Sequence, residues 1–124
     1  MKQREADFGV LLRHFFATGK QRTCLIEIKQ TTTGSLPFNC FEPGQVAYLQ
    51  AAKSTKGVLI RNSGGMSVPD YSYYRNEPAY VGVRYPKSFH LIDIDTFLME
   101  QQRSKRKSLT EARAAELSTI SVKI

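Results

Sequence analysis

The sequence predicts an α/β fold with a mixed central sheet and flanking helices, and three observations lead to it. An apolar, β-prone run covers residues 23–30, and two further runs cover residues 79–85 and 88–94. Between them, residues 43–57 carry apolar side chains at helical spacing. A helix between strands is typical of a crossover that joins parallel strands, whereas the two closely spaced runs predict an antiparallel hairpin.

Length, composition and charge indicate the class of protein. At 124 residues and 41% hydrophobic content, the chain is expected to form a single domain over residues 1–124. Its net charge of +7, from 18 Lys and Arg against 11 acidic residues, favours a polyanionic binding partner. Nucleic acid is expected as that partner in preference to a membrane surface. Cys24 and Cys40 form no C-x-x-C pair, so we expect two reduced thiols and no zinc site. No segment is typical of a membrane span or signal peptide, which predicts a soluble, cytoplasmic protein.

The first half of the chain is expected to hold a hairpin, a loop and a helix. Residues 8–16 and 23–30 are β-prone and are separated by a polar, Gly-containing stretch, which predicts an antiparallel pair. Thr, Gly, Ser and Pro in residues 31–39 predict a loop. The following helix is expected to begin at Pro43 and to end before Gly57.

The second half is expected to alternate strands and short helices. Residues 58–61 are interpreted as a buried strand that joins the sheet in parallel, and residues 62–78 as a long surface loop. Asp95 is predicted to cap a helix that ends before a basic run. Ser108, with Glu111 three residues later, predicts the start of a last helix, followed by an extended carboxyl-terminal segment.

Glu27 and Lys29 are the most informative pair in the sequence. Because they lie two residues apart on a predicted strand, both side chains point to the same face of a sheet that is otherwise apolar. Burying charge is costly unless it is paired or bound to a metal, so the pair suggests a metal-dependent phosphodiesterase. A solvated sheet edge is the alternative for an isolated E-x-K. Asp7 upstream and Gln45 downstream favour a site.

Several motifs follow this pair in a definite order, and together they resemble a known family. They are Asp7-Phe8-Gly9, Glu27-Ile28-Lys29-Gln30-Thr31, Leu36-Pro37-Phe38, the helix opening from Phe41 to Gln45, the strand Phe89-His90-Leu91-Ile92-Asp93, and the stretches 106–109 and 120–124. This order resembles the PD-(D/E)-x-K nuclease superfamily, and within it the RecU-type Holliday junction resolvases, also called penicillin-binding-protein-related factor A. The resemblance implies a restriction-endonuclease-like core.

The resemblance also implies a mechanism. Asp7, Glu27 and the backbone carbonyl of Ile28 would bind Mg²⁺ or Mn²⁺, which prefer oxygen ligands. Lys29 would orient the attacking hydroxide and offset charge on the phosphate, and Gln45 would align water or the DNA backbone. The implied protein is a magnesium-dependent endodeoxyribonuclease that acts on Holliday junctions in recombination and repair. It would bind branched DNA as a homodimer, without an organic cofactor and without a membrane partner.

Basic residues are expected to bind the DNA phosphates. The predicted contacts are made by Lys20, Arg22, Arg103, Lys105, Arg106 and Lys107. A solvated linker between helices is the alternative for residues 103–107. The tyrosines of residues 71–74 would stack on unpaired bases or pack on a partner subunit.

Two features keep other functions open. The family carries a further acidic residue on a helix ahead of its first catalytic strand, and only six residues precede Asp7. That carboxylate is absent, or comes from another subunit or from Glu111 or Glu116. A DNA-binding or assembly protein that has lost catalysis, and a flap or end nuclease, are therefore the alternatives. An active site also requires an asymmetric hairpin, with Gly9 opposite Glu27, so that Asp7 lies close enough to share a metal.

Overall fold

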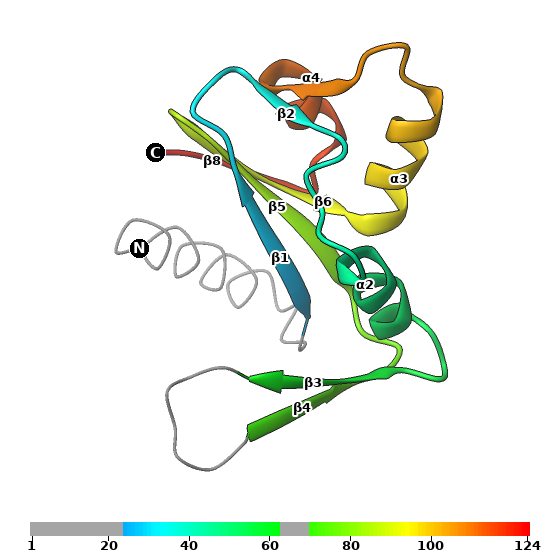
Figure 1. The fold of residues 1–124 in the computed structure, drawn as a ribbon. Coiled ribbons are helices and arrows are strands. Elements are labelled where there is room, and N and C mark those ends of the chain that lie inside the picture. The colour runs from blue at the N-terminus through cyan, green and yellow to red at the C-terminus, as the bar shows by residue number, and fades with distance from the viewer. Residues whose placement is uncertain (1–23, 63–69) are drawn as a thin grey trace.

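Four strands form a mixed central sheet in the part of the chain that the computed structural model describes, residues 24–62 and 70–124 (Figure 1). The strands, in spatial order, are β1 (Leu25–Gln30), β5 (Ala79–Tyr85), β6 (Ser88–Asp93) and β8 (Ile120–Lys123). β1 is parallel to β5, and the β5–β6 and β6–β8 pairs are antiparallel. The expected mixed α/β sheet with flanking helices is confirmed, and so is the hairpin with its turn at Pro86 and Lys87.

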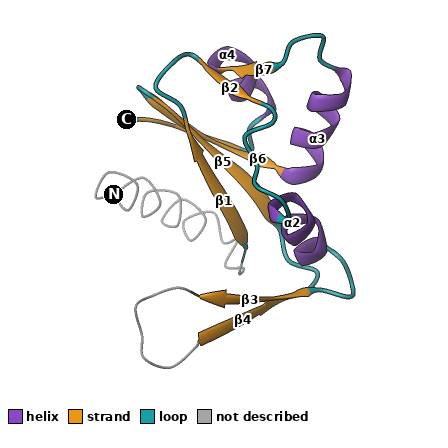
Figure 2. Cartoon of the chain, in the orientation of Figure 1, coloured by secondary structure: helices purple, strands orange, loops and turns teal. Residues whose placement is uncertain are grey.

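Among the described residues, three helices lie on the sheet, and the helical stripe in residues 43–57 is confirmed as a helix (Figure 2). They are α2 (Gln45–Lys53), α3 (Ile94–Arg103) and α4 (Glu111–Leu117). α2 begins at Gln45 rather than Pro43, because Gly44 takes a left-handed φ of 90° that ends the preceding loop. Asp93, not Asp95, caps α3, since its carboxylate accepts the Asp95 N–H at 2.8 Å.

Ser108 is predicted to cap the last helix, and this prediction is wrong by two residues. Ser108–Thr110 forms strand β7, and Thr110 caps α4 by accepting the Arg113 N–H at 3.2 Å. β7 pairs antiparallel with β2 (Ser35–Pro37), so part of the expected loop 31–39 is also a strand. Leu36 and Leu109 face each other in this ladder and are both buried, which explains why a short polar stretch becomes ordered.

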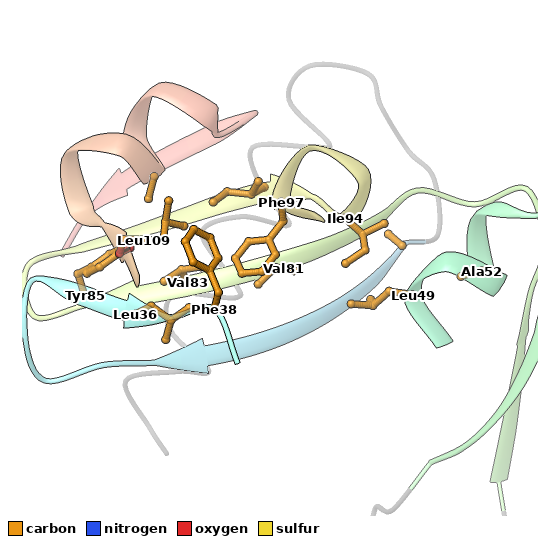
Figure 3. Close-up of a cluster of buried hydrophobic side chains, with 13 residues drawn as sticks. Leu36, Phe38, Leu49, Ala52, Val81, Val83, Tyr85, Ile94, Phe97 and Leu109 are labelled. Carbon is orange, nitrogen blue, oxygen red and sulfur yellow. Dashed lines mark hydrogen bonds between the residues drawn. The ribbon is translucent and has the colours of Figure 1, made fainter. Parts of the chain in front are cut away.

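The main core lies between the sheet and the three helices (Figure 3). Alternate residues of β5 point into it, and Phe97 of α3 contacts Phe38 edge-on, with 5.7 Å between ring centroids. Its buried members are Leu36, Phe38, Leu49, Ala52, Ala79, Val81, Val83, Tyr85, Ile92, Ile94, Phe97, Leu109 and Ala114. On the other face of the sheet, Ile26 and Ile28 pack against Phe89 and Leu91. β5 is thus buried on both faces, which accounts for its nearly continuous apolar sequence.

The expected parallel strand at residues 58–61 is wrong. β3 (Val58–Asn62) pairs antiparallel with β4 (Asp70–Tyr74) in a separate two-stranded sheet that extends from the body in Figure 1. Leu59 and its cross-strand partner Tyr73 are exposed, at 59% and 57%, so this run is not a buried strand. β4 also replaces part of the predicted loop 62–78, because its tyrosines favour extended backbone.

Several expectations lie outside the described residues. They include the hairpin partner at residues 8–16, the asymmetric register, and the site residues Asp7, Lys20 and Arg22. Within residues 24–62 and 70–124, no helix is long and apolar enough to cross a membrane.

Candidate active site

Strand β1 presents Glu27 and Lys29 on the face of the sheet that the helices cover. Leu25, two residues before Glu27, packs on the main core, whereas Ile26 and Ile28 pack on the opposite face. The alternation of a β-strand therefore carries the two charged side chains to the helix-covered face, as their spacing predicted.

Gln45 joins these two side chains. The Lys29 Nζ donates a hydrogen bond to Gln45 Oε1 at 2.7 Å, and Gln45 Nε2 donates to Glu27 Oε1 at 3.0 Å. The ammonium and the carboxylate also form an ion pair, with 3.5 Å between Nζ and Oε1. Residues from two separate elements thus form one polar network, which we name the Glu27–Lys29–Gln45 cluster.

The orientation of the Gln45 amide follows from the start of α2. The backbone N–H of Glu42 donates to Gln45 Oε1 at 2.9 Å, and the Gln45 N–H donates to the Glu42 carbonyl at 3.2 Å. Because both the Glu42 N–H and the Lys29 ammonium are donors only, the amide oxygen must face them and the amide nitrogen must face Glu27. The Gln45 side chain therefore accepts from the cation through its oxygen and donates to the anion through its nitrogen.

Lys29 lies in a largely closed environment beside an aromatic ring. Its side chain is 15% exposed, against 33% for Glu27. The ammonium lies 5.3 Å from the centroid of the Phe41 ring, which in turn contacts Phe97 edge-on at 5.4 Å. An ammonium over an aromatic face is stabilised by the ring quadrupole, so Phe41 helps to hold the lysine head group. Sequence reasoning did not assign Phe41 this role.

The neighbouring thiol of Cys40 is kept protonated. Burial raises its pKa, and Glu27 raises it further, while Lys29 and a backbone hydrogen bond act in the opposite direction. A thiol in this state is a poor nucleophile.

Oxygen atoms suited to a divalent cation lie next to the cluster. The N–H groups of Leu25 and Thr31 both donate to carbonyls of the β5 chain, at Pro78 and Arg84. Since backbone polar groups alternate in direction along a strand, the Ile28 carbonyl points away from β5. The Glu27 carboxylate and this carbonyl are hard oxygen donors of the kind that Mg²⁺ and Mn²⁺ prefer. In the described part of the chain, no three or more His, Cys, Asp or Glu side chains gather into a metal-binding group.

The basic run lies at the end of α3 and in the linker that follows. Arg103 ends the helix, and Lys105, Arg106 and Lys107 are exposed in the linker to β7. None of these four residues takes part in an ion pair found among the described residues. The linker is tied to the chain that leads to α2, because the Phe38 N–H donates to the Lys107 carbonyl at 3.0 Å.

The other acidic and histidine candidates have different partners. Glu111 accepts a hydrogen bond from Ser88, and Glu116 pairs with Arg113 at 2.7 Å. His90 is a strand residue, as expected, held between Ser88 and Ser121 by hydrogen bonds of 2.8 Å at its two ring nitrogens. None of these hydrogen bonds joins them to the Glu27–Lys29–Gln45 cluster.

Comparison with known proteins does not assign the chain to a family. No protein-family model, no curated protein and no solved structure matches it.

Proposed function

We propose that the protein is a metal-dependent, structure-selective DNA endonuclease of the junction-resolving kind, with a restriction-endonuclease-like core. The observation that carries this proposal is the Glu27–Lys29–Gln45 cluster, in which a carboxylate, an ammonium and an amide meet through bonds of 2.7 to 3.5 Å. The parallel arrangement of β1 and β5, with α2 between them in the chain, agrees with such a core.

Each member of the cluster has a role in this proposal. Glu27 and the Ile28 carbonyl would hold Mg²⁺ or Mn²⁺, together with Asp7. When bound, such an ion lowers the pKa of a water molecule and polarises a phosphate. The Lys29 ammonium lies beside the carboxylate and would offset the negative charge that develops on the phosphate. Gln45 keeps both head groups in place before the substrate arrives.

The charge of the molecule supports DNA as the substrate. The net charge is +7, and the exposed basic residues of the α3–β7 linker have no acidic partner among the described residues. Such side chains attract phosphates at long range and bind them without regard to sequence. Two symmetric cuts at a four-way junction would require two copies of the site, so a two-fold homodimer is the assembly we propose.

Cleavage of a labelled four-way DNA junction, with duplex and flap controls, tests the proposal. We expect paired nicks in Mg²⁺ or Mn²⁺, and loss of at least about 100-fold in rate for Glu27→Gln and for Lys29→Met. Lys87→Met, an exposed lysine in the β5–β6 turn, is the matched control and should keep its rate. Circular dichroism of each variant separates lost chemistry from lost folding.

The same assay identifies the alternatives. If the protein cleaves flaps or ends instead, and the same two variants lose that cleavage, the active-site assignment stands and the proposed substrate changes. Tight junction binding with no cleavage in either metal would show a DNA-binding or assembly protein without catalysis. Equal rates of cleavage by the native protein and Glu27→Gln would show that the Glu27–Lys29–Gln45 cluster takes no part in the reaction.

A further inference from the structure

A cavity of about 480 Å³ lies between the chain that follows β2 and the basic linker between α3 and β7. Its volume falls in the range of ~300–1,000 Å³ that is usual for ligand pockets. Its main lining residues are Phe38, Asn39, Gln101, Arg106, Lys107 and Ser108. We name it the linker cavity.

The lining of the linker cavity combines positive charge with amide groups. Arg106 and Lys107 are exposed cations, and Asn39 and Gln101 each carry both a donor and an acceptor. No acidic residue is among the described residues that line the cavity. The cavity is therefore suited to an anion that also carries hydrogen-bonding edges.

The walls are held in place by contacts across the chain. The β2–β7 ladder pairs Leu36 with Leu109, and the Phe38 N–H donates to the Lys107 carbonyl at 3.0 Å. Phe38 is only 5% exposed and contacts Phe97, so one wall is part of the core. Two segments about seventy positions apart in sequence thus form a single supported site.

The linker cavity is connected to the candidate active site through the core. Phe38 of the cavity and Phe41 of the active site both contact the Phe97 ring edge-on, at 5.7 and 5.4 Å. Only three positions separate Phe38 from Phe41. The Phe97 ring therefore links the two sites through the core.

We propose that the linker cavity binds one unpaired nucleotide of a DNA strand. Arg106 and Lys107 contact its phosphate, and the carboxamides of Asn39 and Gln101 contact the edge of its base, in the way that such groups bind adenine. A paired base stays in the stack, so a concave site of this kind accepts only a base that has left it. This inference rests on the proposed function for its DNA ligand but not on cleavage.

Binding of a short labelled oligonucleotide by fluorescence anisotropy, in EDTA and over a range of salt, tests the proposal. We expect the full chain to bind the single strand more tightly than the matching blunt duplex. Arg106→Ala/Lys107→Ala should reduce the slope of log affinity against log salt by roughly 0.7, because the two cations contact one phosphate and each neutralised single-strand phosphate adds about 0.7 to that slope. Lys56→Ala/Lys87→Ala, at exposed lysines elsewhere, should leave the slope unchanged.

Loss of the Asn39 and Gln101 amide groups is expected to change the affinity but not its salt dependence. Asn39→Ala/Gln101→Ala should weaken single-strand binding roughly tenfold, with no change in salt slope, because no charge is removed. Gln102→Ala, the exposed neighbour on α3, is the control. Equal binding of strand and duplex by the native protein, or native affinity in the Asn39/Gln101 variant, would overturn the proposal.

The outcome is separable from that of the proposed nuclease. The binding assay runs in EDTA, where metal-dependent cleavage does not occur, so its result does not depend on whether the native chain cleaves DNA. If the native chain cleaves no substrate but the cavity variants behave as expected, the endonuclease fails and the nucleotide site stands. If the native chain cleaves junctions and the cavity variants bind the oligonucleotide as the native chain does, the nucleotide site fails and the endonuclease stands.

Discussion

Gln45 serves as hydrogen-bonding partner to two opposite charges at the candidate site. Its amide satisfies the Lys29 ammonium and the Glu27 carboxylate, which lie at the edge of the core with side chains 15% and 33% exposed. A hydrocarbon side chain at this position would leave both charged groups without that partner. The residue thus links the stability of the fold to the preorganisation of the site.

Gln45→Leu is expected to destabilise the protein by about 1–3 kcal/mol, the usual cost of leaving buried polar groups without partners. Urea unfolding followed by circular dichroism measures this change. Gln50→Leu, at an exposed position of the same helix, is the control and should change stability by less than about 0.5 kcal/mol. Equal effects of the two substitutions would show that the Gln45 amide contributes nothing.

His90 is the second residue whose environment has a measurable consequence. It is 4% exposed, and burial lowers its pKa, while Glu111, which Ser88 bridges to the ring, acts in the opposite direction. Its folded pKa is therefore below the value of about 6.5 in the unfolded chain. The unfolded state binds the proton more readily, so the neutral ring stabilises the fold above pH 6.5 and that contribution is lost as the pH falls toward the folded pKa.

Native protein should accordingly lose stability below about pH 6.5 more steeply than His90→Gln. Urea unfolding at a series of pH values, with the difference between the two proteins taken at each pH, isolates this histidine from the carboxylates that titrate nearby. A difference that does not vary between neutral and mildly acidic pH would contradict the assignment.

At the scale of elements, the short β2–β7 ladder contributes more than its length suggests. It connects the chain after β1 to the chain after α3, and the Tyr85 hydroxyl donates to the Leu109 carbonyl at 2.8 Å beneath it. Leu36 is 2% exposed in the main core. The ladder therefore positions both the stretch that leads to Gln45 and one wall of the linker cavity.

Leu36→Ala should cost about 2–5 kcal/mol of unfolding free energy, since it removes buried methyl groups and leaves a cavity. Leu59→Ala makes the same chemical change on β3, where the side chain is 59% exposed, and should stay within about 0.5 kcal/mol. Denaturant unfolding of the pair measures the contrast. Similar losses in both would mean that the β2–β7 ladder is not part of the cooperative core.

At the scale of the whole molecule, a bound cation would couple the candidate site to global stability. A ligand that binds only the folded state stabilises it by about 2.7 kcal/mol at a hundred times its dissociation constant. We expect Mg²⁺ to raise the thermal midpoint of the native chain and to leave that of Glu27→Gln unchanged. Glu116→Gln, whose carboxylate pairs with Arg113 on α4, should respond as the native chain does.

The sequence by itself determined those features that depend on neighbours in the chain. The alternation of Leu25, Glu27 and Lys29 set one face of β1, and helical spacing located α2. Pro86 and Lys87 located the hairpin turn, since local turn chemistry suffices for that. The order of motifs around Glu27 also pointed to Gln45, and the structure brings it to within 3.0 Å of that residue.

Only the tertiary structure decided the features that depend on distant partners. Residues 58–61 are as apolar as a core strand, but their pairing with β4 makes Leu59 solvent-exposed. Leu36 lies in a polar stretch and becomes a strand only because Leu109 is opposite. The Phe41 ring under Lys29 and the linker cavity likewise need segments far apart in sequence. Local propensity is weak beside the free energy of burying apolar surface, so long-range packing settles such cases.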